Sequence, residues 1–423
     1  MNILVVCAQF PYPPRSGFAT RVYQLTRQLA QRHQVTLLSY ASPQEHEAVA
    51  ALAQELPVHV VHREPASVAG KRVAQALSML SARPYSCREV YSDEMQHAIS
   101  ELCRGAAFDA VQLESSLLCT FAFPADVRVV LDEHNVEYEV FQRMSEGERS
   151  VPRRLFNWVE HSCFRRFEQR WWTRVDGCAV TSARECRIVS AHAKQTPVAV
   201  VPNGVDLDHF SPSPTPVERH AVVFNGILTY RPNLDAALHL VDEVWPRVLR
   251  SCPDARLRVV GRGSPADIRR LRRPGVEVLG EVPDVKPYLA AAEVVAVPVR
   301  IGGGTRLKVV EALAMGKATV STSLGCEGVA VRDGEHLLIG DGADSFARRV
   351  LELFDDPAMA ARLGRAGRSL TERAYSWSLA GERLEDLYQR LAAPVRVDDR
   401  ATPAWRPLTR AGALGSSETT TTT

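Results

Sequence analysis

The chain has 423 residues, of which 45% are hydrophobic and 24% charged, and its formal net charge is +2. This composition is that of a globular protein, and a chain of this length predicts two domains rather than one core. The near-neutral charge gives no reason to expect a nucleic-acid partner, and no segment approaches the roughly 20 apolar residues of a membrane span.

Cysteine usage and the first residues bear on the compartment. The nine cysteines are scattered singly, with no C-x-x-C pair and no zinc-like spacing. Such a set indicates reduced thiols and a cytoplasmic location. The short apolar run Ile3–Ala8 has no basic lead, so we expect a first β-strand there and not a signal peptide.

Strand-like and helical segments alternate through the first half, which predicts a parallel, doubly wound sheet. The expected strands are Asn2–Ala8, Gln34–Tyr40, Val58–Val61, Ala110–Leu113, Arg128–Leu131 and Cys178–Thr181. The expected helices are Phe18–Arg32, Pro43–Leu56, Ser67–Leu80, Asp93–Arg104, Val136–Met144 and Pro152–Arg174. A capping box at Ser182-Ala-Arg-Glu185 predicts a further helix after Thr181.

A proline-rich stretch then interrupts the alternation. Pro202, Pro212, Pro214 and Pro216 cannot share a helix or a central strand, so this stretch is the expected domain linker. We therefore expect a first domain over residues 1–205 and a second over 206–377. A helix over 378–392 should pack back towards the first domain, and 393–423 should be a disordered tail.

The alternation restarts after the linker, so a second α/β domain is expected. Its expected strands are Ala221–Asn225, Arg256–Val260, Val276–Leu279, Glu293–Val299 and Ala318–Thr322. Its expected helices are Asn233–Arg250, Val285–Ala291, Ser345–Phe354, Pro357–Arg373 and Leu379–Leu391. Two such domains would face each other across a cleft, with ligand loops at the carboxyl ends of their strands.

A glycine-rich loop is the strongest signal in the chain. After the expected strand Glu293–Val299 come Gly302, Gly303 and Gly304, and a helix is expected to open at Thr305. The glycines remove the Cβ atoms that would keep a ligand off the backbone. The helix start directs free N–H groups and a positive dipole end to the same place, which suits a phosphate.

Charged residues continue this pattern along the helix. Arg306 and Lys308 add positive charge, and Gly304, Lys308 and Glu311 have the i, i+4, i+7 spacing of one helix face. The Glu311 carboxylate can accept both protons of a vicinal diol. We therefore expect a nucleoside diphosphate along the helix start. The alternative is a plain glycine loop with an amphipathic helix.

Four segments resemble retaining glycosyltransferases of family 4, which have the GT-B fold. They are Pro-Asn-Gly-Val-Asp (202–206), Asn225-Gly226, the Val-Val-Gly-x-Gly stretch ending at Gly263, and Glu-Ala-Leu-Ala-Met-Gly (311–316). The resemblance extends to about Leu391. Tyr230–Asn233 and Gly302–Lys308 are similar to a branch associated with bacterial polysaccharide and surface-glycan assembly.

The resemblance implies transfer of a sugar from a UDP- or GDP-linked donor, with retention of anomeric configuration. The acceptor would be a glycan, a lipid-linked molecule or a small molecule. No cofactor and no metal are implied. The leaving phosphate itself would help deprotonate the acceptor, so the paired carboxylates of glycosidases are not expected.

The family's donor contacts carry over to the second domain in part. The ribose-binding Glu of the Glu-x7-Glu motif matches Glu311, whereas its first Glu matches Gly303, so that carboxylate is missing. Asn225 and Gly226 match the end of the domain's first strand, but the nearest following cation is Arg231, one position out of place. Arg306 and Lys308 are expected to supply the missing charge and to stabilise the departing diphosphate. The alternative is weakened donor binding.

The first domain supplies candidates for the acceptor side. Gly17, with Ser16 and Arg21, matches a family loop that faces the acceptor and the donor phosphate. His134, in Asp-Glu-His-Asn at a strand end, matches a histidine that touches the transferred sugar, and Glu114 ends another strand. The alternatives are a simple connecting loop and a structural histidine, and Asp132, Glu133 and Glu137 are candidates for acceptor binding.

Two further features carry alternatives. Asp206-Leu-Asp208 has the form of a metal motif, but a linker tripeptide arises easily by chance, so no metal is expected there. The segment 152–174 combines arginines with aromatic residues, which fits either peripheral contact with the inner membrane or a scaffold helix with inward aromatics. For the whole protein, the alternatives to a transferase are a sugar-nucleotide 2-epimerase and a non-catalytic nucleotide-sugar or glycan-binding protein.

Overall fold

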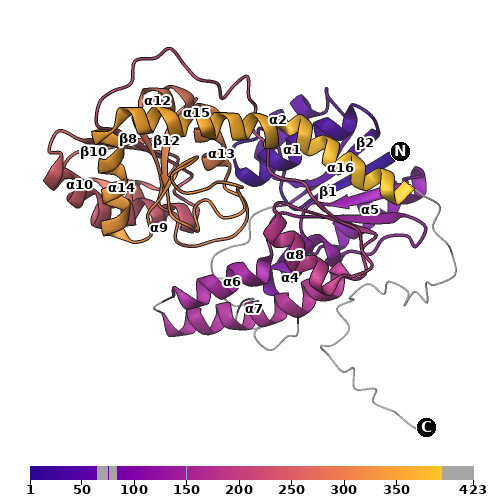
Figure 1. The fold of residues 1–423 in the computed structure, drawn as a ribbon. Helices are drawn as coiled ribbons and strands as arrows, with labels where there is room; N and C mark the ends of the chain where they lie inside the picture. The colour runs from indigo at the N-terminus through magenta and orange to yellow at the C-terminus, as the bar shows by residue number, and fades with distance from the viewer. Residues whose placement is uncertain (64–74, 76–82, 149, 393–423) are drawn as a thin grey trace, which may run out of the picture.

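The computed structural model describes residues 1–63, 75, 83–148 and 150–392 of the chain (Figure 1). The helix expected at Ser67–Leu80 and the tail expected at 393–423 lie outside the described residues, apart from residue 75. The described residues form two parallel sheets, one of seven strands and one of six, with helices between the strands. This confirms the predicted α/β class with two doubly wound domains.

The first sheet has the order β3-β2-β1-β4-β5-β6-β7, and every neighbouring pair is parallel. Its strand order reverses between β1 and β4, and ligands of such sheets bind at the carboxyl ends next to this point. The edge strand β7 was not predicted, because its three residues are only half-buried. The strands are β1 (Asn2–Cys7), β2 (Gln34–Ala41), β3 (Val58–His62), β4 (Ala110–Leu113), β5 (Arg128–Glu133), β6 (Gly177–Val180) and β7 (Val198–Val200).

The helices of the first domain begin where polar side chains cap them. The Oγ atoms of Ser16, Ser92 and Ser182 accept from the backbone N–H three residues on, at the starts of α1, α5 and α8. The short helices α4 and η2 were not predicted. The helices are α1 (Gly17–Ala30), η1 (Pro43–Glu45), α2 (His46–Leu52), α4 (Tyr85–Val90), α5 (Asp93–Gly105), η2 (Ser116–Thr120), α6 (Glu137–Glu146), α7 (Val151–Trp172) and α8 (Ala183–His192).

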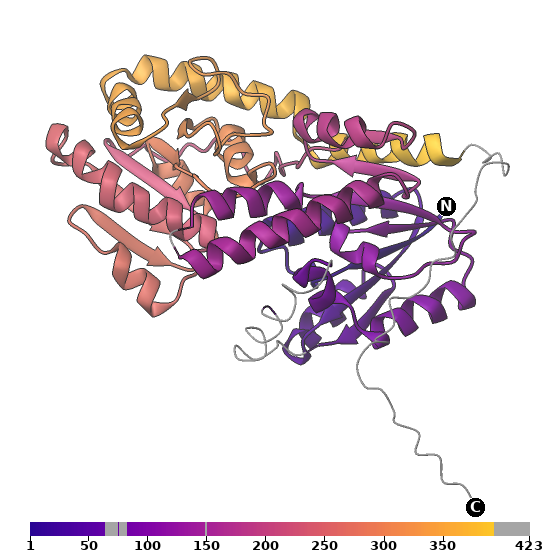
Figure 2. The same ribbon diagram turned by 90° about the horizontal axis from the view of Figure 1, so that it is seen from below.

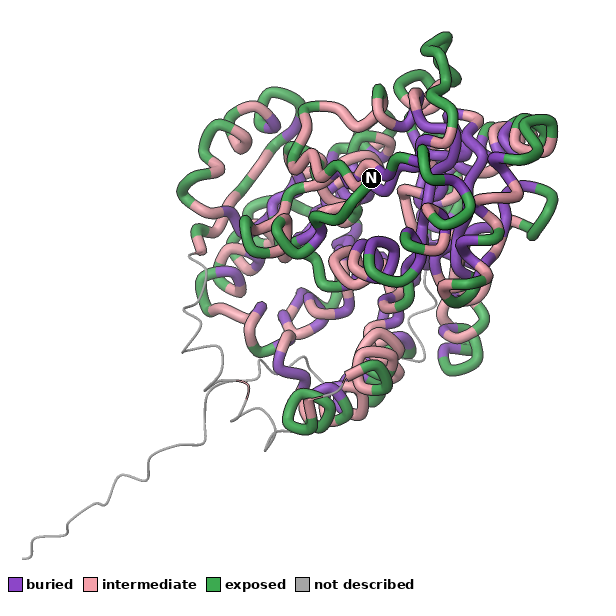
Figure 3. Tube along the Cα trace, turned by 90° about the vertical axis from the view of Figure 1, so that its left-hand side faces the viewer, coloured by how far each residue is buried: buried purple, intermediate pink, exposed green. Residues whose placement is uncertain are grey.

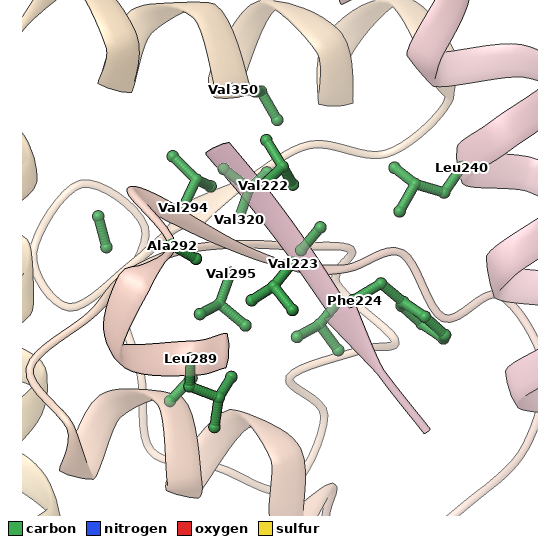
Figure 4. Packing of buried hydrophobic residues seen from close by; sticks show 14 of the residues in the cluster. Val222, Val223, Phe224, Leu240, Leu289, Ala292, Val294, Val295, Val320 and Val350 are labelled. Carbon is green, nitrogen blue, oxygen red and sulfur yellow. The ribbon is translucent and has the colours of Figure 1, made fainter. Parts of the chain in front are cut away.

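The second sheet has the order β10-β9-β8-β11-β12-β13, also parallel throughout. Figure 4 shows its core, where Val222, Val223 and Phe224 of β8 meet Leu240 and Val350 from neighbouring helices. Figure 3 shows buried residues gathered inside the domains and exposed ones on the outer helices and turns. The strands are β8 (Ala221–Asn225), β9 (Arg256–Val260), β10 (Val276–Gly280), β11 (Val294–Val297), β12 (Ala318–Ser321) and β13 (Leu338–Ile339).

The glycine helix starts later than the sequence predicted. Arg306 is the N-cap, with extended backbone, and the helix itself begins at Leu307. Gly302 and Gly304 have φ values of +114° and +70°, which are not helical, so the preceding residues form a loop. Gly304 therefore lies in the loop and not on the helix face with Lys308. The helices here are α9 (Arg231–His239), η3 (Leu240–Val244), α10 (Trp245–Ser251), α11 (Pro265–Leu271), α12 (Lys286–Ala291), α13 (Leu307–Ala314), α14 (Ala343–Asp355), α15 (Pro357–Ala374) and α16 (Trp377–Ala392).

The chain crosses between the domains twice. The first crossing (201–205) and the second crossing (375–377) lie side by side (Figure 1). Val205 N donates to Tyr375 O at 2.7 Å, and a Cβ on Gly204 would lie 2.6 Å from Trp377 N. Only glycine allows that approach. After the second crossing, α16 packs on the first domain, where Tyr388 belongs to the core cluster of β1 and α1.

A buried hydrogen-bond junction joins the first crossing to both domains. Arg21 Nη1 donates to Val201 O at 2.9 Å and to Asn203 Oδ1 at 3.0 Å. Asn203 Nδ2 in turn donates to Thr305 O at 3.1 Å, in the glycine loop. One amide therefore connects the first domain to the loop of the second.

Asn203→Ala should lower the free energy of unfolding by about 1–3 kcal/mol, because it leaves a buried guanidinium N–H and the Thr305 carbonyl unpaired. Urea denaturation followed by circular dichroism measures this. Ser213→Ala, in the exposed linker, is the control and should change the value by less than about 0.5 kcal/mol. Equal stabilities of the two variants would contradict the role given to Asn203.

Candidate functional site

Lys308 and Glu311 lie on the first turns of α13, at the carboxyl ends of β8 and β11. Lys308 Nζ donates to Asn233 Oδ1 at 2.9 Å and stands 4.7 Å from the centroid of the Phe224 ring. A Cβ on Gly226 would lie 2.7 Å from the same Nζ atom. The glycine at 226 therefore makes room for the ammonium group.

Burial changes the ionisation of this pair. It lowers the pKa of Lys308 to about 7, with a contribution from nearby Arg306 and partial compensation from Glu311. It raises the pKa of Glu311 to about 7, although Lys308 and a hydrogen bond from Asn225 oppose the shift. Both groups thus change charge near neutral pH, where a charged ligand would bias them.

Arg306 has buried side-chain nitrogens without a partner in the described part of the chain. Its Nη1 donates to Gly303 O, but its Nε and Nη2 are buried and have no partner among the described residues. The Asn225 Oδ1 atom, at the end of β8, is also buried without a partner there. Buried polar groups are almost always paired, so these atoms of Arg306 and Asn225 are candidates for contacts with a ligand.

The glycine loop is packed against the first domain rather than open. A Cβ on Gly304 would lie 2.1 Å from Asn135 Oδ1, and one on Gly303 would lie 2.8 Å from Val140 Cγ2. From the sequence we expected a ligand above these glycines, but in this structure first-domain side chains fill the space at both positions. At Gly302 the three atoms nearest to an added Cβ all belong to the Arg306 side chain, of which Nη2 is the closest, at 3.1 Å.

Ion pairs from α6 hold the two domains together at this loop. Arg143 Nη1 donates to Gly302 O at 2.7 Å and to Glu327 at 2.8 Å, and its Nη2 donates to the second Glu327 oxygen at 3.0 Å. Arg231 pairs with Glu148 at 2.8 Å. Arg231 thus faces the first domain. No sequence motif indicated that Arg143 and Glu327 would form a contact between the domains.

His134 is held between two carboxylates. Its Nε2 lies 2.9 Å from Glu114 Oε2 and 3.3 Å from Asp132 Oδ2. Burial alone would lower the pKa of His134, but Asp132 and Glu114 outweigh it and raise the pKa to about 9. The side chain is therefore an imidazolium at neutral pH. The Phe18 ring lies 5.1 Å from it.

Arg21 departs from its expected place at a phosphate. The side chain is 1% exposed and donates two hydrogen bonds to Asp132, of 2.8 and 2.6 Å. It also donates to Val201 O and Asn203 Oδ1. It is therefore a structural contact. Ser16 caps α1, and a Cβ on Gly17 would lie 3.8 Å from Leu307 Cδ1, so this loop touches the start of α13.

Two nearby carboxylates have structural partners. Glu168 Oε1 and Oε2 accept from the N–H groups of Glu137 and Tyr138, at the start of α6. Glu133 accepts from Trp172 Nε1 at 2.9 Å, and burial raises its pKa to about 8. Glu133 thus belongs to the packing of α7 rather than to an acceptor surface.

Metal-like groupings exist but are internally paired. Within the described residues, Glu114, Asp132 and His134 have their ligand atoms within 4.8 Å of one another. Arg21 and His134 already occupy the Asp132 carboxylate, so this grouping fits a hydrogen-bond network better than a cation. A second grouping, His220, Cys252 and Asp254, lies just before β8 and β9, at the amino ends of these strands. In the linker, Asp206 Oδ1 accepts from the N–H groups of the next turn.

Comparison with known proteins identifies the family. Residues 15–209 match the model of glycosyltransferase family 4, and residues 219–356 match that of glycosyl transferases group 1.

A GDP-mannose-dependent phosphatidylinositol monomannoside mannosyltransferase of Corynebacterium glutamicum is 30% identical over 229 residues, 48% of this chain and 59% of that protein. The chain thus spans less than two thirds of that relative. A 44.6 kDa protein from the cps region of Klebsiella pneumoniae is 21% identical over 83% of this chain and 90% of its own.

Among solved structures, sucrose-phosphate synthase from Thermosynechococcus elongatus superimposes with a TM-score of 0.69. It is 18% identical and covers 92% of this chain and 99% of its own. That likeness concerns the fold. With both domains matched by their family models, the chain belongs to the group 1 glycosyltransferases of family 4 and has the GT-B fold.

Proposed function

We propose that this protein transfers a sugar from a nucleoside-diphosphate sugar to an acceptor hydroxyl, with retention of anomeric configuration. The observation that carries this proposal is Arg306, whose two unpartnered guanidinium nitrogens lie in the loop before the α13 start. A diphosphate would satisfy both nitrogens and would restore the charge of Lys308.

The donor would lie along β8 and α13. Arg306 and Lys308 would bind the diphosphate together with backbone groups of Gly302–Thr305, and Glu311 would accept from the ribose hydroxyls. The name of the Corynebacterium relative indicates GDP-mannose for that protein. For this chain we propose a UDP- or GDP-linked sugar.

The acceptor would lie on the first-domain side, near His134 and the Ser16–Gly17 loop. Charged as an imidazolium, His134 cannot act as a base but can donate to a sugar or acceptor oxygen. In the reaction, the bond from the anomeric carbon to the diphosphate breaks and the acceptor oxygen bonds to that carbon. The acceptor proton passes to the leaving phosphate, and Arg306 and Lys308 stabilise its charge. This scheme needs no metal.

We place the reaction in the cytoplasm, with a glycan, a lipid-linked molecule or a small molecule as acceptor. None of the nine cysteines, all of which lie within the described residues, forms a disulfide, which suits a reducing compartment. Within the part of the chain that the structure describes, no helix is long and apolar enough to cross a membrane.

A non-catalytic sugar-nucleotide-binding protein is the second candidate. It is favoured by Gly303, which stands where the family has a carboxylate, and by Val140, which fills the space above it. Release of free nucleotide from UDP- and GDP-sugars, measured with and without candidate acceptors, separates the two. Acceptor-dependent release supports transfer, whereas donor binding without release supports the second candidate.

Arg306→Ala should lower turnover at least about a hundredfold, since its positive charge stabilises the negative charge that builds up on the leaving diphosphate. Arg231→Ala is the matched control, because Arg231 pairs with Glu148 away from α13. Its turnover should stay within a few-fold of wild type. A dead Arg231 variant beside an active Arg306 variant would reverse the assignment of the diphosphate site.

Binding of a nucleoside diphosphate should take up a proton above neutral pH. The free Lys308 amine has a pKa of about 7 and is largely uncharged at pH 8, and the bound diphosphate raises that pKa. The dissociation constant should therefore increase as the pH rises above about 7. Calorimetry in buffers of different ionisation enthalpy counts the protons. Lys308→Arg, always charged, should show no uptake at pH 8; equal uptake by both proteins would exclude Lys308 as its source.

His134→Ala should lower sugar transfer by about tenfold to a thousandfold, the result of losing a few kcal/mol of transition-state contact. Binding of nucleoside diphosphate should change little, because the nucleotide site belongs to the second domain. His134→Gln, which can still donate to Glu114, controls for the structural role and should fold normally. Wild-type transfer by both variants would make His134 purely structural.

A further inference from the structure

We propose that the exposed face of the first half of α7 binds an anionic membrane surface. This face is formed by Val151, Leu155 and Trp158, with arginines beside it. The proposal concerns where the protein sits and does not depend on the proposed transfer reaction.

The apolar part of this face is unusual for the molecule. Val151, Leu155 and Trp158 are 64%, 48% and 59% exposed, and they are three of the five large hydrophobic side chains that the described residues expose. Their spacing of four and then three residues places them on one side of the helix. They therefore form one contiguous apolar surface, and are not isolated exposed side chains.

The opposite side of α7 does the packing. Asn157, Glu160, Phe164 and Glu168 are almost completely buried, and the Phe164 ring stacks on Phe141 of α6 at 5.2 Å. The scaffold role and the membrane role expected from the sequence thus belong to different faces. The inward face accounts for Phe164, whereas Trp158 is 59% exposed.

The charges that α7 exposes all have one sign. Its two acidic residues, Glu160 and Glu168, are buried, so the exposed charged residues of the helix are arginines only. These are Arg153, Arg154, Arg165, Arg166 and Arg170. Since the whole chain has a net charge of only +2, this is a local concentration. Apolar residues with flanking arginines match the boundary between acyl chains and anionic headgroups.

The position of this face relative to the donor site also fits a membrane-borne acceptor. Figure 2 shows α6 and α7 side by side, with their joined ends reaching the second domain. There Glu148 pairs with Arg231, next to Tyr230, which is 53% exposed. If the proposed transfer is correct, docking through α7 would bring the junction of the domains close to an acceptor in the same membrane.

A second copy of the chain is a weaker occupant. Three apolar side chains offer far less than the about 800 Å² per partner of a typical stable interface. Five exposed arginines would also repel the same face of another copy. An anionic lipid surface matches both the apolar and the charged part.

The test is co-sedimentation of the full chain with vesicles of phosphatidylcholine alone or mixed equally with phosphatidylglycerol. Wild type should sediment with the mixed vesicles and dissociate at high salt. Leu155→Ser/Trp158→Ser should lower the partition coefficient at least about tenfold. Val217→Ser, a change at an exposed valine of the second domain, should not.

The charge requirement has its own matched pair. Arg154→Gln/Arg165→Gln/Arg166→Gln should weaken binding at least about tenfold. Arg348→Gln/Arg362→Gln/Arg365→Gln, on exposed positions of α14 and α15, removes the same three charges and should not. Far-UV circular dichroism of all variants reports correct folding.

Three results would overturn the proposal: no binding of wild type to mixed vesicles, equal binding to phosphatidylcholine alone, or equal losses in both triple variants. A wild-type dimer in sedimentation equilibrium that Leu155→Ser/Trp158→Ser converts to a monomer would also overturn it, in favour of self-association. Failure of sugar transfer would leave these readouts unaffected.

Discussion

The buried ion pair of Arg21 with Asp132 is the interaction on which the junction of the two domains depends. Both side chains are almost fully inaccessible, and two hydrogen bonds join them in a bidentate pair. Burial by itself would raise the pKa of Asp132, but Arg21 and His134 hold it below its usual range. Removal of one partner of a buried ion pair costs about 3–5 kcal/mol. The pair thus fixes α1 against the end of β5 and leaves Arg21 Nη1 free to bind Asn203.

A continuous polar path runs from this pair through the first domain. Tyr388 of α16 donates to Gln112 at 2.8 Å, and Gln112 donates to Glu114 at 2.6 Å. Glu114 bonds His134, which also meets Asp132. Since Asn203 continues the path to Thr305, groups from both ends of the chain position the same glycine loop. Each polar group along it is satisfied, whereas Arg306, just beyond its end, is not. A ligand site typically combines such a fully hydrogen-bonded network with polar side-chain atoms that lack a partner, as two nitrogens of Arg306 do here among the described residues.

The glycine loop serves two neighbours at once. Gly303 and Gly304 admit side chains of the first domain, and Gly226 admits the Lys308 ammonium. The short distances at Gly303 and Gly304 bring the two domains together. The short distance at Gly226 brings the Lys308 ammonium to the carboxyl end of β8. Larger residues would separate these parts, so the absence of Cβ atoms matters here for protein packing as much as for a ligand.

The sequence by itself determined the class of fold and most of the strands, because these depend on local periodicity. From short motifs it also predicted a domain linker and a donor site with Arg306, Lys308 and Glu311, which stay predictions. It did not predict β7 and β13, whose two or three residues carry no periodic pattern. It placed the start of α13 two residues too early, since positive φ angles at two glycines are not visible in composition. Only the tertiary structure decided the partners of Arg21, Asn135 and Arg143. Arg21 and Asn203 are 182 residues apart, and Arg143 and Glu327 are 184 apart. Such pairs form only once both sheets are built and packed, so no local pattern of residues can indicate them.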